Sequence, residues 1–252
     1  MTASINSSPL QRERDLRGQT VVVIGGSSGI GLETARLARA SGANIILTAR
    51  DPDRLHRAGL ELGASIAAFD ATDFDRLGRF FDALPTPINH LLVTGPGPCH
   101  APLAVFDLNA ARRDLEAHLL LPLQVARYAA SKVRPGGTLL FMGGTSGRRP
   151  AAGLAFIAAL TAALPAMTKS LALEMAPVRV NLIAAGFVDT PLPALLPGDQ
   201  IDQRRKQLRT TPPIGRVVDP ADIAALAVHL MTNTAVTGAT FDIDGGQQLV
   251  EG

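Results

Sequence analysis

The sequence predicts a single α/β domain built on a doubly wound parallel sheet of about seven strands, with helices on both faces. Two observations carry this prediction. Short apolar or β-branched runs alternate with segments of helical periodicity, and a glycine-rich turn joins the first run to the first helix. With 252 residues and no internal linker or repeat, the chain is long enough for one large domain.

The predicted strands are short runs bounded by turn residues. The first, TVVVIGG, ends in glycines, which is typical of a buried strand that enters a tight turn. In chain order the runs cover residues 20–26, 43–50, 64–73, 88–97, 136–144, 178–186 and 239–246. Between them, apolar residues at helical spacing predict helices at residues 30–41, 51–62, 74–84, 108–133 and 153–176.

Composition argues against several classes of function. The net charge is only +2 and no basic stripe is interleaved with aromatic residues, so nucleic-acid binding is not expected. No cluster of His, Cys, Asp or Glu has metal-ligand spacing, and Cys99 is the single cysteine, so we expect neither a metal site nor an internal disulfide.

The ends and the apolar runs predict where the protein works. No apolar run approaches the roughly 20 residues of a membrane span, and residues 1–16 form a polar arm without a signal-peptide core. We therefore expect a soluble cytoplasmic protein whose folded domain covers residues 17–252. A Pro-rich segment at residues 190–216 is expected to form a cap, and it contains no motif that identifies a substrate.

The first turn predicts a dinucleotide site. Gly25, Gly29 and Gly31 form G-x-x-x-G-x-G between the first strand and the first helix. Glycines allow the backbone to approach a pyrophosphate, and the N–H groups of the helix N-terminus attract its negative charge. The other turn residues, expected beside the ligand, are Ser27, Ser28 and Ile30. The alternative is a tight strand–helix turn without a ligand.

The end of the second strand predicts which dinucleotide binds. An acidic residue there suits the ribose hydroxyls of NAD, whereas a basic residue suits the 2′-phosphate of NADP. Arg50 occupies this place and Asp51 follows one step later, which favours NADP(H); alternatively, Arg50 is a solvated surface charge. Asp70, followed by Ala71, ends the third strand and either accepts from the adenine amino group or caps a helix that starts near Thr72.

Several motifs in order resemble those of the short-chain dehydrogenase/reductase family over residues 17–250. They are GGSSGIG, FDATD, TKSLALEMAPVRVN, AGFVDTP, GRVVDPADIAALAVHL and TGATFDIDGG. The resemblance implies a Rossmann-like domain, an NAD(P) cofactor, oxidation or reduction at carbonyl and hydroxyl groups, and a homodimer or homotetramer built on the two long helices.

The resemblance also implies further cofactor contacts. Thr94 and Gly95 begin TGPG, where the family has Asn-Asn-Ala-Gly. Gly186, Val188 and Thr190 match the segment that bonds the nicotinamide carboxamide, although the family's proline is Ala185 here.

The family's catalytic residues are all replaced in this register. Counting back from LALEMAPVRVN places the tyrosine position at Ile157 and the lysine position at Thr161. The serine position falls on Gly144 and the asparagine position on His118, while Lys169 lies two turns beyond Thr161. Without a phenol to protonate the alkoxide, the ordinary mechanism loses about 10²–10⁴-fold in rate.

The one Tyr-x-x-x-Lys string of the sequence, YAASK at residues 128–132, lies in the wrong place. It precedes the fifth strand, and Tyr128 is about 15 Å along the helix from His118. We therefore interpret Tyr128 as an outward-facing residue near a helix end.

Other residues could replace the lost groups. His118 is either an acid–base group or a satisfied core or interface histidine. Thr145 and Ser146 either present a hydroxyl to the substrate oxygen or only complete a turn. Cys99 and His100 would lie near the mouth of the pocket.

Three functions remain open from the sequence. The first is an NADP(H)-dependent oxidoreductase with a rearranged proton donor. The second is an NADP-binding pseudoenzyme or regulatory subunit, assembled with itself or with an active paralogue. The third is a non-redox isomerase or cyclase acting in an apolar pocket lined by Leu154, Ile157 and Phe187.

Overall fold

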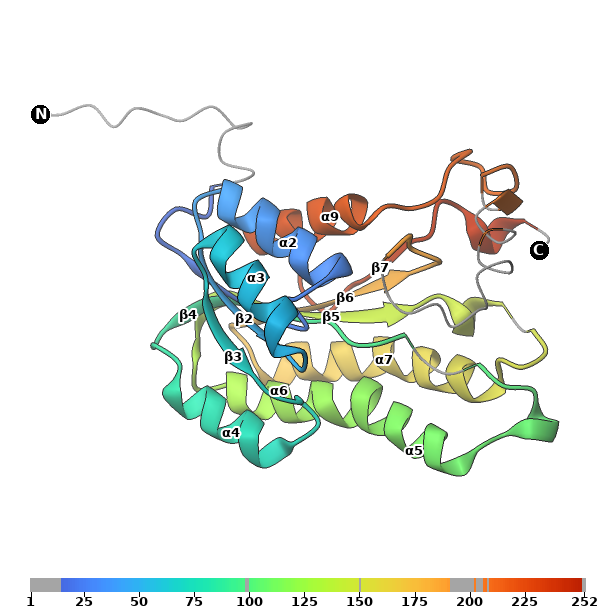
Figure 1. Cartoon of the computed structure of the whole chain (residues 1–252), viewed down its shortest axis with the longest axis horizontal. Coiled ribbons are helices and arrows are strands. Elements are labelled where there is room, and N and C mark those ends of the chain that lie inside the picture. Colours follow the sequence, from blue (N-terminus) through green and yellow to red (C-terminus); the bar gives the residue numbers. More distant parts are fainter. Residues whose placement is uncertain are drawn as a thin grey trace, which may run out of the picture.

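The sheet of the protein is parallel and seven-stranded. The structure is a computed structural model that describes residues 15–97, 100–149, 151–190, 202, 206–207 and 209–250. Its strands are ordered β3-β2-β1-β4-β5-β6-β7 and all pair in parallel (Figure 1). Their bounds are β1 Thr20–Ile24, β2 Asn44–Ala49, β3 Ser65–Ala68, β4 Ile88–Val93, β5 Val133–Gly144, β6 Arg179–Ala185 and β7 Thr240–Ile243. The predicted fold class is confirmed.

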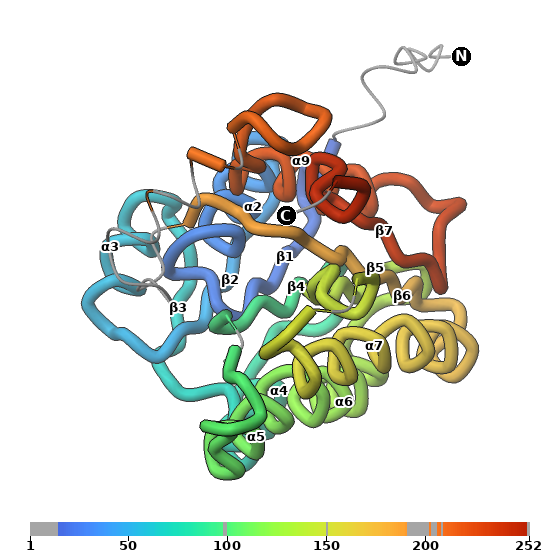
Figure 2. The backbone as a smooth tube through the Cα atoms, turned by 90° about the vertical axis from the view of Figure 1, so that its right-hand side faces the viewer, coloured from blue at the N-terminus to red at the C-terminus, as the bar shows by residue number. Residues whose placement is uncertain are grey.

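Helices cover both faces of this sheet, as Figures 1 and 2 show. One layer contains α2 Gly29–Ala40, α3 Pro52–Leu62 and α9 Pro220–Thr232. The other contains α4 Phe74–Ala83, α5 Leu108–Leu115, α6 Leu121–Ala129 and α7 Ala155–Glu174. Short 3₁₀ turns lie at Leu103–Val105, Ser146–Arg148 and Gln247–Leu249.

Helix α9 was not among the predicted helices. Its buried residues lie on one side, but Ala225 and Leu226 make the other side apolar as well, so the contrast that marks an amphipathic helix is weak. A start signal was nevertheless present, because Asp219 and Asp222 form a capping box around Pro220.

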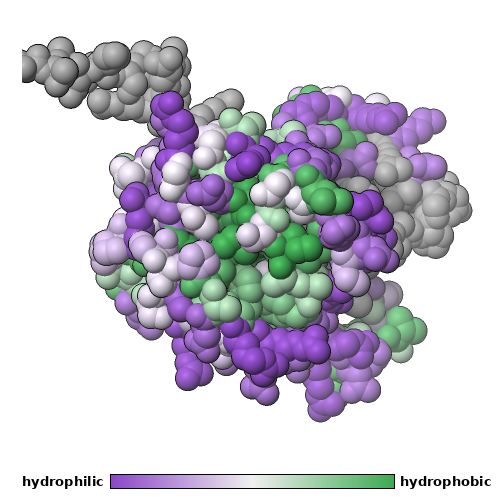
Figure 3. All heavy atoms as spheres, turned by 60° about the vertical axis from the view of Figure 1, so that its left-hand side comes forward, coloured by the Kyte–Doolittle hydropathy of each residue, from purple (hydrophilic) through white to green (hydrophobic). Residues whose placement is uncertain are grey.

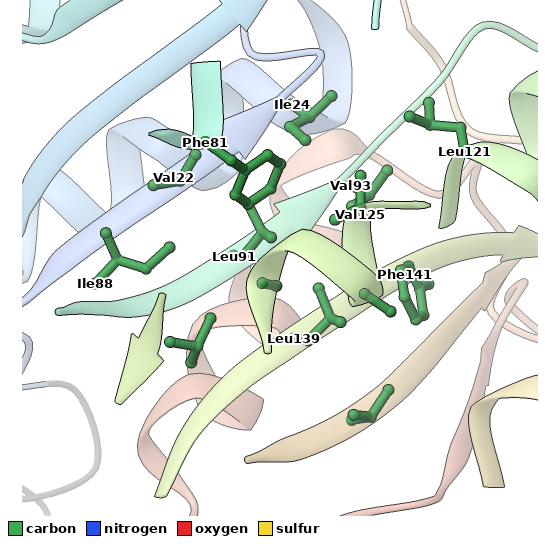
Figure 4. Close-up of a cluster of buried hydrophobic side chains, with 14 of the residues drawn as sticks. Val22, Ile24, Phe81, Ile88, Leu91, Val93, Leu121, Val125, Leu139 and Phe141 are labelled. Atoms are coloured by element: carbon green, nitrogen blue, oxygen red, sulfur yellow. The ribbon is translucent and has the colours of Figure 1, made fainter. Parts of the chain in front are cut away.

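Each face of the sheet has its own core. Val22 and Ile24 of β1 belong to the core beneath α4, α6 and α7 (Figure 4), whereas Val21 and Val23 belong to the core beneath α2, α3 and α9. Successive side chains of a strand point to opposite faces, so the apolar run of β1 supplies both cores.

The long helix predicted at residues 108–133 is interrupted. A π-helical turn at Glu116–Leu120 separates α5 from α6, and Leu121 donates its N–H to the carbonyl of Glu116, five residues earlier. Pro122 follows the turn and has no N–H for the carbonyl of His118, which an α-helix would require. The π turn accommodates this missing donor and carries His118 at its centre.

Helix α7 is an exception to the prediction that no apolar run approaches the length of a membrane span. Its 20 residues have a mean hydropathy of 1.5, long and apolar enough to cross a membrane by length and composition. In the fold it packs on β5 and β6, and Ile157, Leu160, Leu164 and Leu171 contribute to its buried side.

The sheet ends at the short strand β3. Leu60 and Ile66 near this edge are 72% and 41% exposed. Figure 3 shows apolar side chains gathered among polar ones on the face turned toward the viewer. The N-terminal arm lies almost entirely outside the described residues, as does most of the cap segment at residues 190–216.

Candidate functional site

The candidate site lies where the order of the strands reverses. β1 is flanked by β2 and β4, so the connections after β1 and β4 leave the sheet in opposite directions, and ligands of open α/β sheets bind in the crevice between them. Figure 2 views the molecule from the side toward which the strands run. The glycine turn follows β1 at this edge, and Thr94 follows β4.

Thr94 braces the glycine turn. Its hydroxyl donates to the carbonyls of Ile24 (3.0 Å) and Gly25 (3.1 Å). Gly25 has φ +86°, and a Cβ there would lie 2.3 Å from the Thr94 Oγ1. The residue predicted as a cofactor contact therefore uses its hydroxyl to hold the turn against β4.

The start of α2 is free to accept an anion. Ser28 is its N-cap in an extended conformation, makes no side-chain cap bond, and no acidic residue lies in the first turn. A Cβ at Gly31 would lie 2.3 Å from the carbonyl oxygen of Gly25, so the turn requires glycine there. By contrast, aspartates cap four other helices: Asp51, Asp73, Asp107 and Asp219. The open N–H groups fit a pyrophosphate.

The segment after β6 reaches the same turn. A Cβ at Gly29 would lie 3.3 Å from the Thr190 Cγ2, which places the predicted nicotinamide segment against the start of α2. Val188 of this segment forms a parallel bridge with Val218. The two predicted ends of the cofactor site are thus brought together.

A glutamine near the C-terminus holds the start of this segment. Gln247 accepts the N–H of Phe187 at 3.0 Å, and its Oε1 would lie 2.8 Å from a Cβ at Gly186. Asp244 would lie even closer, at 2.6 Å through its Cβ. Sequence reasoning missed Gln247, because no local pattern indicates a contact across sixty residues.

The carboxylate next to Arg50 is already engaged. Asp51 accepts hydrogen bonds from the N–H groups of Asp53 (3.1 Å) and Arg54 (3.0 Å). The hydrogen bond from Arg54, together with the positive charge of Arg54, lowers the pKa of Asp51 below 3.8. Arg50 is exposed. Ser27, Arg54, Arg57 and Glu61 are among the residues that line a hollow of about 250 Å³. The two α3 arginines are candidates that sequence reasoning missed.

Asp70 forms a local turn. Its Oδ1 accepts the N–H of Thr72 at 3.0 Å and the hydroxyl of Thr72 at 2.8 Å. The alternative prediction that it caps the next helix is wrong, since α4 starts at Phe74 and is capped by Asp73. Ala71 packs against the core beneath α4.

Three inert residues meet at the end of β5. A Cβ at Gly144 would lie 3.4 Å from the Thr161 Cγ2, and Ile157 is 2% exposed. The Thr161 hydroxyl donates back to the carbonyl of Ile157 at 2.9 Å. None of the three offers a proton to a ligand. Leu154 and Phe187, also expected to line this pocket, are half-buried.

The Thr145–Ser146 turn is anchored from a distance. The N–H of Thr145 donates to the carbonyl of Ala185 at 3.2 Å. Arg148, in the same turn, pairs with Asp242 at 2.9 and 3.0 Å, and this hydrogen bonding lowers the pKa of Asp242. The hydroxyls of Thr145 and Ser146 make no hydrogen bond to another described residue, so both remain available.

His118 is the titratable side chain that faces this region. A Cβ at Gly95 would lie 3.8 Å from the His118 Cε1, so the ring adjoins the backbone after β4. Its Nε2 is buried without a hydrogen-bond partner among the described residues. Burial lowers its pKa below 6.5, against an opposing effect of Asp114. The alternative of a satisfied core or interface histidine stays a prediction, although the Nε2 has no partner within the described residues.

Tyr128 has a structural role elsewhere. Its ring stacks on Phe81 with centroids 5.5 Å apart, and its hydroxyl donates to the carbonyl of Phe74 at 3.5 Å. It is half-buried against α4, so the expected outward orientation is wrong. Lys132 donates to the carbonyl of Asp82 at 3.3 Å. The YAASK string serves packing between α6 and α4.

The remaining candidates are peripheral. Cys99 lies outside the described residues, and Lys169 is exposed on the second half of α7. In the part of the chain that the structure describes, no three His, Cys, Asp or Glu side chains form a group able to hold a metal ion.

Comparisons with known proteins agree on one family. A family model described as enoyl-(acyl carrier protein) reductase matches residues 24–248. The short-chain dehydrogenase/reductase ATR9 of Stachybotrys chlorohalonatus is 29% identical over 247 residues, which cover 92% of this chain and 97% of that protein.

Two solved structures extend the likeness. The MalC reductase/Diels-Alderase of Malbranchea aurantiaca is 26% identical with a TM-score of 0.85, covering 95% of this chain and 99% of the other. BdcA, crystallised in complex with NADPH, is 27% identical with a TM-score of 0.82, covering 91% and 94%.

Proposed function

The chain belongs to the short-chain dehydrogenase/reductase family, and from this membership we propose that it is an NADP(H)-dependent oxidoreductase of carbonyl and hydroxyl substrates that uses a rearranged proton donor. The observation that carries the proposal is the start of α2, where no side chain caps the backbone N–H groups and Thr190 lies against Gly29. When bound, the nicotinamide supplies or accepts a hydride.

This chain's residues fit that dinucleotide. The N–H groups at the start of α2 would hold the pyrophosphate, and the segment from Gly186 to Thr190 would hold the nicotinamide. Arg50 favours the 2′-phosphate of NADP, because it is exposed and Asp51 already caps α3. Ser27, Arg54 and Arg57 line one hollow and are further candidates for this phosphate. A BdcA structure with NADPH supports this choice of cofactor.

The proton has to move through a group other than the family's phenol. In the register implied by the resemblance, Gly144, Ile157 and Thr161 replace the serine, tyrosine and lysine. His118 takes the acid–base role, since its ring adjoins Gly95 and its buried Nε2 has no hydrogen-bond partner within the described part of the chain. The hydroxyls of Thr145 and Ser146 are placed to steady the substrate oxygen.

A titration and a turnover assay test the proposal together. NADPH fluorescence measures binding to the full chain. Absorbance at the nicotinamide band then follows oxidation of NADPH with a panel of aldehydes and ketones, and reduction of NADP⁺ with the matching alcohols. We expect binding and turnover in at least one direction. Absence of NADPH binding would overturn the cofactor assignment.

Two other functions keep specific support. Loss of the family's serine, tyrosine and lysine suits an NADP-binding pseudoenzyme, for which tight binding without turnover is expected. The likeness to a reductase/Diels-Alderase, with the apolar residues Leu154, Ile157 and Phe187, suits an isomerase or cyclase. Conversion of a substrate without net change in NADPH would favour that function.

The assembly proposed for this chain is a homodimer or homotetramer in the cytoplasm, with a paralogue as an alternative partner. Helices α6 and α7 supply the contact, because apolar side chains are left uncovered on both. Leu120, Leu123 and Leu173 are 38%, 41% and 82% exposed. We propose neither a membrane nor a nucleic acid as a partner.

A further inference from the structure

The chain between β4 and α5 leaves apolar side chains uncovered beside the candidate site. All of residues 102–109 are exposed. Four of them are large and apolar: Leu103, Val105, Phe106 and Leu108 are 85%, 70%, 40% and 55% exposed. The one charged residue of this segment, Asp107, accepts the N–H of Asn109 at 2.8 Å and caps α5. Apolar side chains gathered in this way are typical of a surface that binds an apolar ligand or partner.

This segment packs against the start of α7. A Cβ at Gly153 would lie 3.5 Å from the backbone N of Pro102. The ring of Phe106 meets that of Phe156 edge to face, with centroids 5.8 Å apart. Figures 1 and 2 show α5 and α7 starting at the edge toward which the strands run. Phe156 is about 7.5 Å along α7 from Thr161, a residue of the candidate site. The two rings therefore lie at the side of that site.

In the described residues around this aromatic pair, no lysine or arginine is free for an anionic substrate. Arg148 and Arg149 are the only such residues in the ranges 94–107, 144–149 and 151–161. Arg148 is paired with Asp242, and Arg149 donates to the carbonyl of Val250. A phosphate or carboxylate on the substrate would therefore lose water there without gaining a charged partner, which is costly. A neutral substrate carries no such cost.

We propose that the substrate is a neutral carbonyl compound or alcohol with a bulky apolar body, and that Phe106 and Phe156 are specificity-determining residues that pack against this body. This inference rests on the proposed function, because it names the substrate class of the same site. Burial of apolar surface favours such a substrate, and the exposed Leu103 and Val105 extend the apolar surface for longer ones. A small or strongly polar substrate would leave the two rings uncovered.

Binding of a fluorescent ketone tests this without turnover. Acedan is a neutral naphthyl ketone whose emission shifts to shorter wavelength in apolar surroundings. It is titrated into the full chain alone and in the presence of NADP⁺, which cannot reduce it. We expect saturable binding with the shift in emission. Phe106→Ser and Phe156→Ser should each raise the Kd of acedan about fivefold or more, because each removes an aromatic ring from the contact.

Two further variants separate this contact from other effects. Phe106→Leu keeps an apolar side chain and should retain most of the affinity for acedan. Leu60→Ser removes an apolar side chain that is 72% exposed on α3, at the other end of the sheet, and should leave the Kd unchanged. Circular dichroism verifies the fold of each variant.

A series of straight-chain methyl ketones gives the second readout. Each added CH₂ should raise kcat/KM for reduction about three- to fourfold, which corresponds to about 0.8 kcal/mol per buried CH₂. Phe106→Ser should make this dependence on chain length shallower, whereas Leu60→Ser should retain it. A ketone of the same length that ends in a carboxylate should react more slowly than its neutral counterpart.

The outcomes separate this inference from the proposed function. Acedan binding that depends on Phe106 and Phe156, without reduction of any ketone, would keep the apolar binding surface and overturn the proposed function alone. Absence of saturable binding, or a Kd unchanged in both serine variants, would overturn the inference, as would kcat/KM values independent of chain length. A smaller sedimenting species for Phe106→Ser with unchanged acedan affinity would also overturn it, since the surface would then be a contact between subunits.

Discussion

At the scale of the residue, the proposed chemistry depends on what each side chain near the sheet edge can still do. The Thr161 hydroxyl donates a hydrogen bond to the carbonyl of Ile157, and Gly144 has no side chain. His118 keeps an unpartnered buried nitrogen, and Arg50 keeps an exposed charge whose neighbouring carboxylate is engaged elsewhere. Proton transfer and cofactor choice are therefore predicted to depend on these two residues.

The pH dependence of turnover follows from His118. Burial places its folded-state pKa below 6.5, so the cationic acid predominates only below that lowered pKa and the neutral base above it. We expect kcat for reduction to fall as pH rises through this value, and kcat for oxidation to rise. Rate profiles from pH 5 to 11 test this, and His118→Gln should flatten both. A wild-type profile governed only by an ionisation near pH 10 would contradict it.

The cofactor preference follows from Arg50. Reversal of its charge in Arg50→Asp should weaken NADPH binding about tenfold or more and leave NADH binding nearly unchanged, because only NADPH carries the 2′-phosphate. Fluorescence titration with both dinucleotides gives the ratio. Arg79→Asp, at an exposed site on α4, is the control for the change in net charge. Equal losses for both cofactors would contradict the assignment.

At the scale of the element, a few long-range bonds hold the loops and helices around the sheet. Arg148 and Asp242 join the turn after β5 to β7, and Gln247 joins the C-terminal 3₁₀ turn to the segment after β6. On the opposite edge, Arg179 of β6 donates to carbonyls at the end of α9. Each bond holds a loop or the end of one element in place against another element.

Replacement of Arg179 should weaken the link between β6 and α9 and destabilise the fold. Its buried guanidinium donates to the carbonyls of Leu230 (2.7 Å), Met231 (2.8 Å) and Asn233 (2.9 Å), and it also bonds the hydroxyl of Thr138. We expect Arg179→Met to lower the free energy of unfolding by about 2–4 kcal/mol, because these buried acceptors lose their donor.

Urea unfolding measures this effect. Arg79→Met removes an exposed arginine of α4 and should change the unfolding free energy by no more than about 0.5 kcal/mol. If the two variants were equally stable, the network around Arg179 would contribute nothing.

At the scale of the whole molecule, the two faces of the sheet are closed by helices, but the outer surface of α6 and α7 stays apolar. Only 28% of the most apolar window of α7 is buried within one chain. Exposed apolar area of this kind is typical of a surface that a second subunit covers. The proposed homo-oligomer accounts for that surface.

Charges placed on this surface should break the assembly. We expect the wild type to sediment as a dimer or tetramer, and Leu123→Asp combined with Leu173→Asp to sediment as a smaller species, since burial of two carboxylates opposes association. Leu60→Asp, on α3 at the other end of the sheet, serves as the control because Leu60 is 72% exposed. An unchanged oligomer in the double variant would place the contact elsewhere.

Local sequence patterns determined much of the secondary structure and of the turns of this protein. The alternation of strands and helices, the two-sided burial of β1, the glycine turn and the misplaced YAASK string could all be recognised from neighbouring residues, because secondary structure and tight turns depend on short-range periodicity and sterics. The cofactor segments and the register of Gly144, Ile157 and Thr161 came instead from the family resemblance, and they stay predictions.

Only the tertiary structure decided which groups meet. Thr94 bonds a carbonyl 69 residues earlier, Gln247 holds an N–H 60 residues away, and Tyr128 serves α4 rather than a ligand. The His118 ring, carried by the π turn, adjoins Gly95. Such contacts depend on how helices and loops pack against the finished sheet, and no local pattern of the sequence encodes that packing.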